Sequence, residues 1–212
     1  GLDQSLLRLK REYPKNKTKI VVMGVVPSTI VRIMCMWKHY NEFGNTFGFK
    51  PRFVLEKGKL KLIKNYIDTE KKFMNYKHYL PQIRKYDYFY KTKFQKEMLQ
   101  FPYLISVFCN PIRNIPLIFL VSKYKWLGKH KKLEEYPAPM NVIMRINLKL
   151  RVDMFRKNAS AVKLLEKIIE EFARYGKEKN FIPVFLLMPQ KDDLLLARKK
   201  KKIYYEELIN HL

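Results

Sequence analysis

The sequence predicts an α/β fold, and three segments carry that prediction. Ile20–Val26 and Phe181–Met188 are short apolar runs, each followed by a proline. Such runs are typical of strands that are buried on both faces of a parallel sheet. Asn158–Tyr175 carries apolar residues at three- and four-residue spacings, which predicts a helix with one buried face. Together they favour a parallel α/β core.

The segment between the two strands is expected to form an insertion over residues 41–145. Arg52–Leu55 and Lys59–Ile63 flank Glu56-Lys57-Gly58, a pattern that predicts a β-hairpin. The chain from Asp68 to Lys132 is rich in aromatic residues and is expected to be helical. The whole chain, 1–212, is interpreted as one domain.

The long helix also yields two local predictions. Glu170 and Arg174 are four residues apart, so we expect them to form an ion pair. Gly176 follows the last apolar position and is expected to end the helix. Near the N-terminus, Asp3 precedes a second apolar helical pattern and is expected to cap it.

The composition leaves a choice about binding partners. The chain has 44 basic and 19 acidic residues and a formal net charge of +25, which would attract nucleic acid or another polyanion. The basic residues are spread from Lys10 to Lys202, and this favours solvated faces over a dedicated nucleic-acid site. The aromatic cluster Tyr86–Phe94 could stack on bases, but helix packing is the favoured interpretation.

The two cysteines, Cys35 and Cys109, do not form a CxxC pair, so no zinc or redox motif is indicated. Buried free thiols are favoured, and a disulfide between the two cysteines is the alternative.

No segment approaches the ~18 apolar residues of a membrane span. The first residues resemble the middle of a domain, so we expect that an N-terminal part is missing. The sequence does not decide whether the protein belongs to the cytoplasm or to the cell envelope.

Candidate functional residues follow the two predicted strands, because parallel sheets place their sites at the carboxyl ends of strands. These segments are Met23–Ser28 and Met188–Asp193. Asp192 and Asp193 are adjacent and would point different ways on a helix, so capping is favoured over a paired-carboxylate site. The four histidines are isolated. We expect no metal and no cofactor.

The segments at residues 1–9, 19–26, 161–175 and 181–189 resemble the SGNH/GDSL-type hydrolases of bacteria. Gly1–Leu9 resembles the segment after the second glycine region of that family, and Lys19–Val26, with Gly24, resembles its third block, a strand ending in Gly-x-Asn. Ala161–Tyr175 and Phe181–Pro189 are similar to its late helix–strand pair. Phe49–Phe53 with Leu60–Leu62 resembles an insertion found in a bacterial subgroup.

The resemblance implies a flavodoxin-like three-layer α/β/α domain that hydrolyses or transfers acyl esters, with an acylated carbohydrate or small ester as substrate. The family's Gly-Asp-Ser nucleophile block and Asp-x-x-His base block do not occur in the 212 residues, and Val26 stands at the asparagine position. Gly24 and Ser28 are the candidate residues of an oxyanion-side loop, although Ser28 is better explained as a helix cap.

The sequence therefore predicts part of an ester hydrolase or acyl-transfer domain that is inactive by itself. Two alternatives stay open. One is a basic module that binds nucleic acid or an anionic polymer. The other is a catalytically dead domain of the same type that serves protein assembly. The oligomeric state is not indicated by any pattern in the sequence.

Overall fold

The computed structural model describes residues 1–42, 45–98, 103–108, 111–129 and 139–212. The strands are β1 (Ile20–Val25), β2 (Arg52–Glu56), β3 (Lys59–Ile63) and β4 (Ile182–Leu187). The helices are α1 (Leu2–Glu12), α2 (Thr29–Arg32), α3 (Lys38–Asn41), α4 (Glu70–Met74), η1 (Tyr76–Tyr79), α5 (Leu80–Tyr86), η2 (Tyr90–Phe94), α6 (Gln95–Glu97), α7 (Tyr103–Phe108), α8 (Pro111–Lys129), α9 (Pro139–Lys157), α10 (Ala159–Lys179), α11 (Lys191–Lys200) and α12 (Glu206–His211).

The two apolar runs form strands β1 and β4, which pair in parallel with Ile20 opposite Ile182 and Val25 opposite Leu187. Both strands and the α/β class are therefore confirmed. The β2–β3 hairpin is also present as an antiparallel pair. Its turn places Lys57 and Gly58 at positive φ, a conformation that glycine adopts without steric cost. The predicted hairpin is thus confirmed at residue level.

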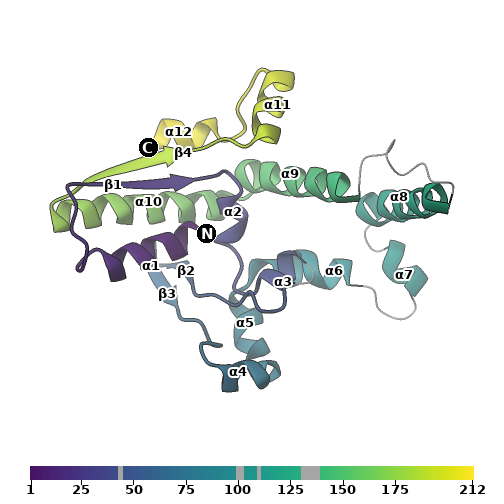
Figure 1. Ribbon diagram of the computed structural model, residues 1–212, viewed down its shortest axis with the longest axis horizontal. Helices are drawn as coiled ribbons and strands as arrows, with labels where there is room; N and C mark the ends of the chain where they lie inside the picture. Colours follow the sequence, from purple (N-terminus) through teal and green to yellow (C-terminus); the bar gives the residue numbers. More distant parts are fainter. Residues whose placement is uncertain (43–44, 99–102, 109–110, 130–138) are drawn as a thin grey trace.

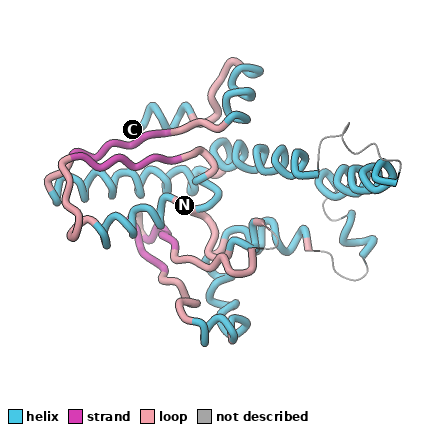
Figure 2. The backbone as a smooth tube through the Cα atoms, in the orientation of Figure 1, coloured by secondary structure: helices cyan, strands magenta, loops and turns pink. Residues whose placement is uncertain are grey.

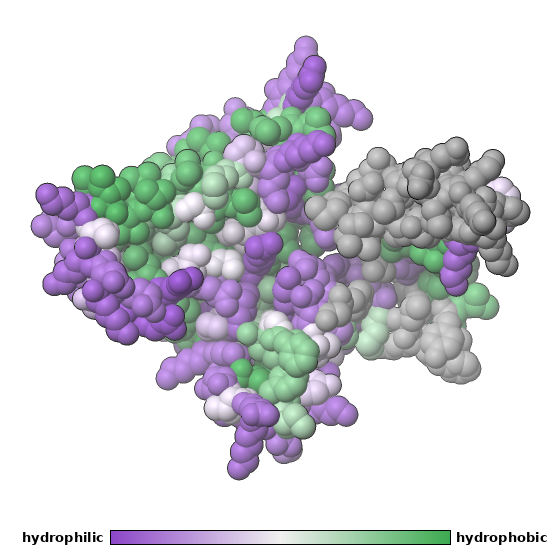
Figure 3. Space-filling view, viewed as in Figure 1, coloured by the Kyte–Doolittle hydropathy of each residue, from purple (hydrophilic) through white to green (hydrophobic). Residues whose placement is uncertain are grey.

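The β1–β4 sheet has one helical layer. Helices α1 and α10 run along the same side of the sheet (Figures 1 and 2), and Met23 and Val25 point into the core beneath it. On the opposite face Ile20, Val22 and Ile182 are more than half exposed, and hydrophobic surface gathers over this part of the molecule (Figure 3). A second helical layer, which the three-layer arrangement requires, is not seen in the described residues and stays a prediction.

Helix α10 is longer than the sequence predicts. Asn158 caps its start by accepting a hydrogen bond from the Ala161 N–H at 3.1 Å, and the helix continues through Gly176 to Lys179. It ends where Asn180 adopts the left-handed conformation, with φ of 58°. The expected stop at Gly176 is therefore wrong, because the lack of a side chain there serves packing.

A Cβ atom at position 176 would lie 2.9 Å from Pro183 Cγ and 3.1 Å from Phe181 Cε2. Phe181 in turn packs against Tyr13, with ring centroids 4.7 Å apart. Gly176 thus allows α10 to approach the start of β4 and the end of α1 closely.

We predict that Gly176→Ala destabilises the protein by about 1–3 kcal/mol, because the new methyl group must displace buried rings. Helix propensity alone would favour alanine by about 1 kcal/mol. A loss of unfolding free energy in Gly176→Ala would therefore report the close contact. Urea unfolding measures the change, and Lys177→Ala at the next, exposed position is the matched control. A more stable Gly176→Ala variant would contradict the packing argument.

The ion pairs of α10 also differ from expectation. Arg174 contacts Glu171 at 2.7 Å and Glu178 at 3.3 Å, whereas Glu170 pairs with Lys167. The predicted Glu170–Arg174 pair is therefore wrong. Glu171 also accepts from Lys10 of α1 at 2.5 Å. The Arg174 and Lys10 hydrogen bonds lower the pKa of Glu171 to about 2, with Arg174 the larger cause.

A carboxylate whose pKa is lowered by folding stabilises the folded state above its ordinary pKa and loses that effect as it is protonated. For Glu171 the loss is expected as pH falls from about 4.5 to about 2. We predict that Glu171→Gln shows a shallower decline of unfolding free energy across this range. Denaturant unfolding at several pH values measures the unfolding free energy of both proteins. The same dependence of this free energy on pH in the two proteins would refute the lowered pKa of Glu171.

The middle of the chain is held to the core by buried polar contacts. The Asp87 carboxylate accepts hydrogen bonds from the backbone N–H groups of Met36, Trp37 and Phe89 at 2.6, 3.0 and 2.9 Å. Arg52 of β2 donates to the Met34 and Tyr86 carbonyls at 2.7 and 2.6 Å. Burial raises the pKa of Asp87, and the three N–H bonds oppose this.

Asp3 has a similar role at the start of the chain. It lies in the first turn of α1 with its side chain fully buried, and it pairs with Lys50 at 2.5 Å. The expectation that Asp3 is the helix cap is therefore wrong, because the helix begins at Leu2. The carboxylate instead ties α1 to the segment that leads into β2.

The aromatic cluster of residues 86–94 packs inward. Phe89 is fully buried, and Tyr90 and Phe94 lie 5.0 and 4.8 Å from the ring of buried Tyr40. Phe89 belongs to the core, and Tyr90 and Phe94 are half-buried against it, as the packing interpretation expects.

The remaining sequence predictions concern thiols and membranes. Cys35 is free and buried, and burial raises the pKa of its thiol to about 11; Cys109 lies outside the described residues. Among the helices that the structure describes, none is both long and apolar enough to cross a membrane.

Candidate functional site

The carboxyl ends of β1 and β4 lie side by side, as their parallel pairing requires. The Met188 N–H donates to the Val25 carbonyl at 2.7 Å and extends the ladder beyond the strands. The two segments singled out in the sequence therefore begin side by side at the carboxyl end of the sheet, where α/β proteins place their sites. The region consists of Gly24–Ser28 on one side and Met188–Asp193 on the other.

Gly24 lies on the exposed face of β1, opposite Leu186. A Cβ atom there would lie 2.8 Å from Met188 Cε. The absence of a side chain thus leaves room for Met188 to lie across the end of β1. Val26, which follows two residues after Gly24, is half-buried and has no polar side-chain group to donate.

Ser28 occupies a tight turn between β1 and α2. The Thr29 N–H donates to the Val26 carbonyl at 2.9 Å, and Val31 N–H donates to the Ser28 carbonyl at 3.2 Å. Ser28 stands at the N-cap position, but its side chain makes no capping hydrogen bond. The predicted cap position of Ser28 is therefore confirmed, but its side chain does not make the capping hydrogen bond.

The Ser28 hydroxyl oxygen is buried and has no hydrogen-bond partner in the part of the chain that the structure describes. Buried hydroxyl groups are usually paired, because an unpaired one costs about 1–3 kcal/mol. The Ser28 hydroxyl is therefore a buried donor without a partner near the carboxyl end of β1. Gly24 and Ser28 are the candidate residues that the structure brings to this place.

The segment after β4 is structural. The Asp193 carboxylate accepts from the Gln190 N–H at 2.8 Å and so caps α11. It also pairs with Arg151 of α9 at 2.7 Å and accepts from the Tyr204 hydroxyl at 2.7 Å. The Asp193 side chain is fully buried, whereas Asp192 is half-buried. The predicted capping role is confirmed for Asp193.

Arg151 and Tyr204 were not identified from the sequence. Arg151 also donates to the Gln190 side chain at 2.5 Å, and burial raises the pKa of Tyr204, as does its hydrogen bond to Asp193. The network joins α9, α11 and the approach to α12. It fixes the path of the chain after β4 and contributes no free acid or base to the site.

We predict that Arg151→Met destabilises the protein by about 3–5 kcal/mol, because it leaves the Asp193 carboxylate buried without its counter-ion. Lys157→Met is the matched control on the same helix, since Lys157 forms an exposed pair with Asp153 at 3.0 Å. That change should cost no more than about 1 kcal/mol. If urea unfolding gave the two variants equal losses of unfolding free energy, burial of the Arg151–Asp193 pair would not set its contribution to stability.

The histidines do not converge on the site. His39 stacks beside Trp37, with ring centroids 4.8 Å apart, and burial lowers its pKa. His78 is exposed, His211 contacts Glu166 at 3.1 Å, and His130 lies outside the described residues. Within the described ranges no group of three or more His, Cys, Asp or Glu side chains is placed to hold a metal ion.

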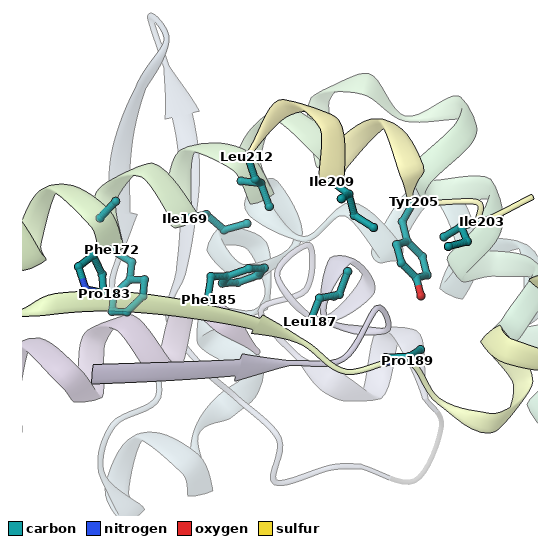
Figure 4. A pocket seen from close by; sticks show the side chains of 11 residues that line it. Ile169, Phe172, Pro183, Phe185, Leu187, Pro189, Ile203, Tyr205, Ile209 and Leu212 are labelled. Atoms are coloured by element: carbon teal, nitrogen blue, oxygen red, sulfur yellow. The ribbon is translucent and has the colours of Figure 1, made fainter. Parts of the chain in front are cut away.

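An apolar cavity of about 590 Å³ lies between α10, β4 and α12 (Figure 4). Phe172, Phe185 and Ile209 are among the side chains that line it, and it reaches Pro189 at the end of β4. Tyr205 supplies its one side-chain hydroxyl, and burial raises the pKa of that group. The cavity offers apolar surface and no catalytic group.

Comparison of the chain with protein families, with curated proteins and with solved structures finds no match in any of the three.

Proposed function

We propose that this chain forms part of an SGNH-type ester hydrolase or acyl-transfer domain with a flavodoxin-like, three-layer arrangement. Its substrate would be an acylated carbohydrate or another small ester. The observation that carries the proposal is the unpaired hydroxyl of Ser28 at the joint carboxyl end of two parallel strands. The resemblance of Lys19–Val26 to the family's third block supports the same place.

In this proposal Gly24 and Ser28 belong to the oxyanion side of the site. Acyl transfer develops negative charge on the carbonyl oxygen, and one fixed donor there is worth roughly two to three orders of magnitude in rate. The Ser28 hydroxyl is buried in this structure, so the turn would have to open for it to donate to that oxygen in place of the amide that Val26 lacks. The Gly24 position has no side chain of its own, and the Met188 side chain that lies across it would have to move to admit the carbonyl.

The 212 residues do not contain the blocks that make and break the acyl bond. A nucleophile must attack the carbonyl carbon, and a base must take its proton and return it to the leaving alcohol. Donors on the oxyanion side accelerate this step only when both are present. The chain by itself is therefore proposed to be inactive.

We predict that the 212-residue chain does not turn over p-nitrophenyl acetate. Lysine side chains acylate slowly, so heat-denatured protein at the same concentration is the control for that background. The release of p-nitrophenol should match this control, and Ser28→Ala should leave it unchanged. Sustained turnover above the control that is lost in Ser28→Ala would overturn the prediction of inactivity.

A second candidate function is binding of a polyanion, and the exposed run Arg198–Lys202 favours it. All five residues are exposed at the end of α11, and none forms an ion pair within the described structure. Salt-titrated binding to RNA or DNA separates this candidate from the first. Tight binding that weakens steeply with salt would support it, because phosphate contacts release counterions.

A further inference from the structure

One edge of the β1–β4 sheet is open. The Ile182 N–H donates to the Lys19 carbonyl at 2.8 Å and the Met188 N–H donates to the Val25 carbonyl. Since alternate residues of a strand face opposite neighbours, the main-chain groups of Ile20, Val22 and Gly24 point away from β4. The Thr18 hydroxyl donates to the Ile20 carbonyl at 3.0 Å, and no described strand pairs with the rest of this edge.

The opposite edge of the sheet is protected. Pro183 of β4 lies opposite Val21, in the alternate set of residues that points away from β1. Proline has no N–H to offer, and prolines at such positions discourage the addition of a strand. β1 has no proline between Ile20 and Val25, so the two edges differ in their capacity to bind a further strand.

The open edge is lined by a groove. A cavity of about 470 Å³ lies between α1 and β1, with Arg8, Leu9 and Glu12 on the helix side and Val22 and Gly24 on the strand side. A strand laid along β1 would turn one row of side chains toward α1 and the other toward the uncovered sheet face. The sheet face is apolar, whereas the α1 side of the groove carries Ser5, Arg8, Glu12 and Asn16 beside Leu9. A strand that alternates apolar and polar side chains therefore suits this edge.

The amino end of β1 carries unpaired positive charge. Lys15, Lys17 and Lys19 are exposed, and none forms an ion pair among the residues that the structure describes. The formal net charge of +25 also opposes close approach of a second copy of the chain. Charge complementarity therefore favours a partner segment with carboxylates at this end of the strand.

We propose that the free edge of β1 binds an extended segment of alternating apolar and polar residues as a third strand, parallel to β1, with acidic residues at its amino end beside Lys17. Parallel addition is chosen because the existing pair is parallel, and purely parallel sheets are over-represented. Main-chain hydrogen bonds to Val22 and Gly24 would hold the segment. This binding is independent of the proposed ester chemistry.

The test uses a synthetic peptide, Glu-Glu-Val-Thr-Val-Thr-Val-Thr, whose last six residues match the six-residue length of β1. In an NMR titration of the full chain, the amides of Val22 and Gly24 should shift and become protected from exchange. The expected Kd is on the order of 0.1–1 mM. The reversed order, with both glutamates at the carboxyl end, should bind several-fold more weakly.

Val22→Pro removes an outward N–H, as Pro183 does on β4, and should weaken binding at least tenfold. Val184→Thr, on the same face of the sheet but on β4 and away from the open edge of β1, is the matched control and should change the Kd less than about twofold. Should Val22→Pro not fold, Lys17→Glu tests the charge: it should weaken binding about threefold, and Lys163→Glu should not.

Three results would overturn the proposal. The first is the absence of shifts at Val22 and Gly24 with 2 mM peptide, on the order of the expected Kd. The second is tighter binding of the reversed peptide, which would refute the parallel arrangement. The third is shifts at these amides that depend on protein concentration alone, which would assign the edge to a second copy of the chain. Absence of esterase activity would affect none of them.

Discussion

The hydrogen-bonded pairing of β1 with β4 is the constraint on which the rest of the structure depends. It joins residues 20–25 to residues 182–187 in a single parallel register. The residues between them therefore form one long connection from the end of β1 to the start of β4. A parallel pair requires a crossover connection, and α10 ends this one by packing beneath the sheet (Figure 1). The pairing also places Val25, at the end of β1, beside Met188, which follows β4.

Buried charges hold the rest of the chain to this pair, and each is compensated by a segment that is distant in sequence. Asp3 pairs with Lys50, and Asp193 pairs with Arg151. Asp87 accepts the N–H groups at residues 36 and 37. Removing one partner of such a pair costs far more than the intact pair contributes. These contacts therefore specify the path of the chain, while apolar burial supplies most of the stability.

The sequence predicts the elements whose cause is local. β1, β4 and the hairpin follow from short apolar runs and a turn, and α10 follows from its periodic stripe. Gly176 was misread because helix stops and close packing both use glycine, and only the position of Pro183 separates them. Gly24 and Ser28 could be singled out by motif. Arg151 and Tyr204 could not, because nothing local marks the carboxylate they contact.

The open edge and the candidate site are two parts of one region, since Gly24 belongs to both. A segment added parallel to β1 would run toward the same end of the sheet as β1, because parallel strands share their direction. In parallel sheets, sites are assembled from the ends of neighbouring strands. A segment bound at the β1 edge would therefore bring its carboxyl end to the end of the sheet where Gly24 lies.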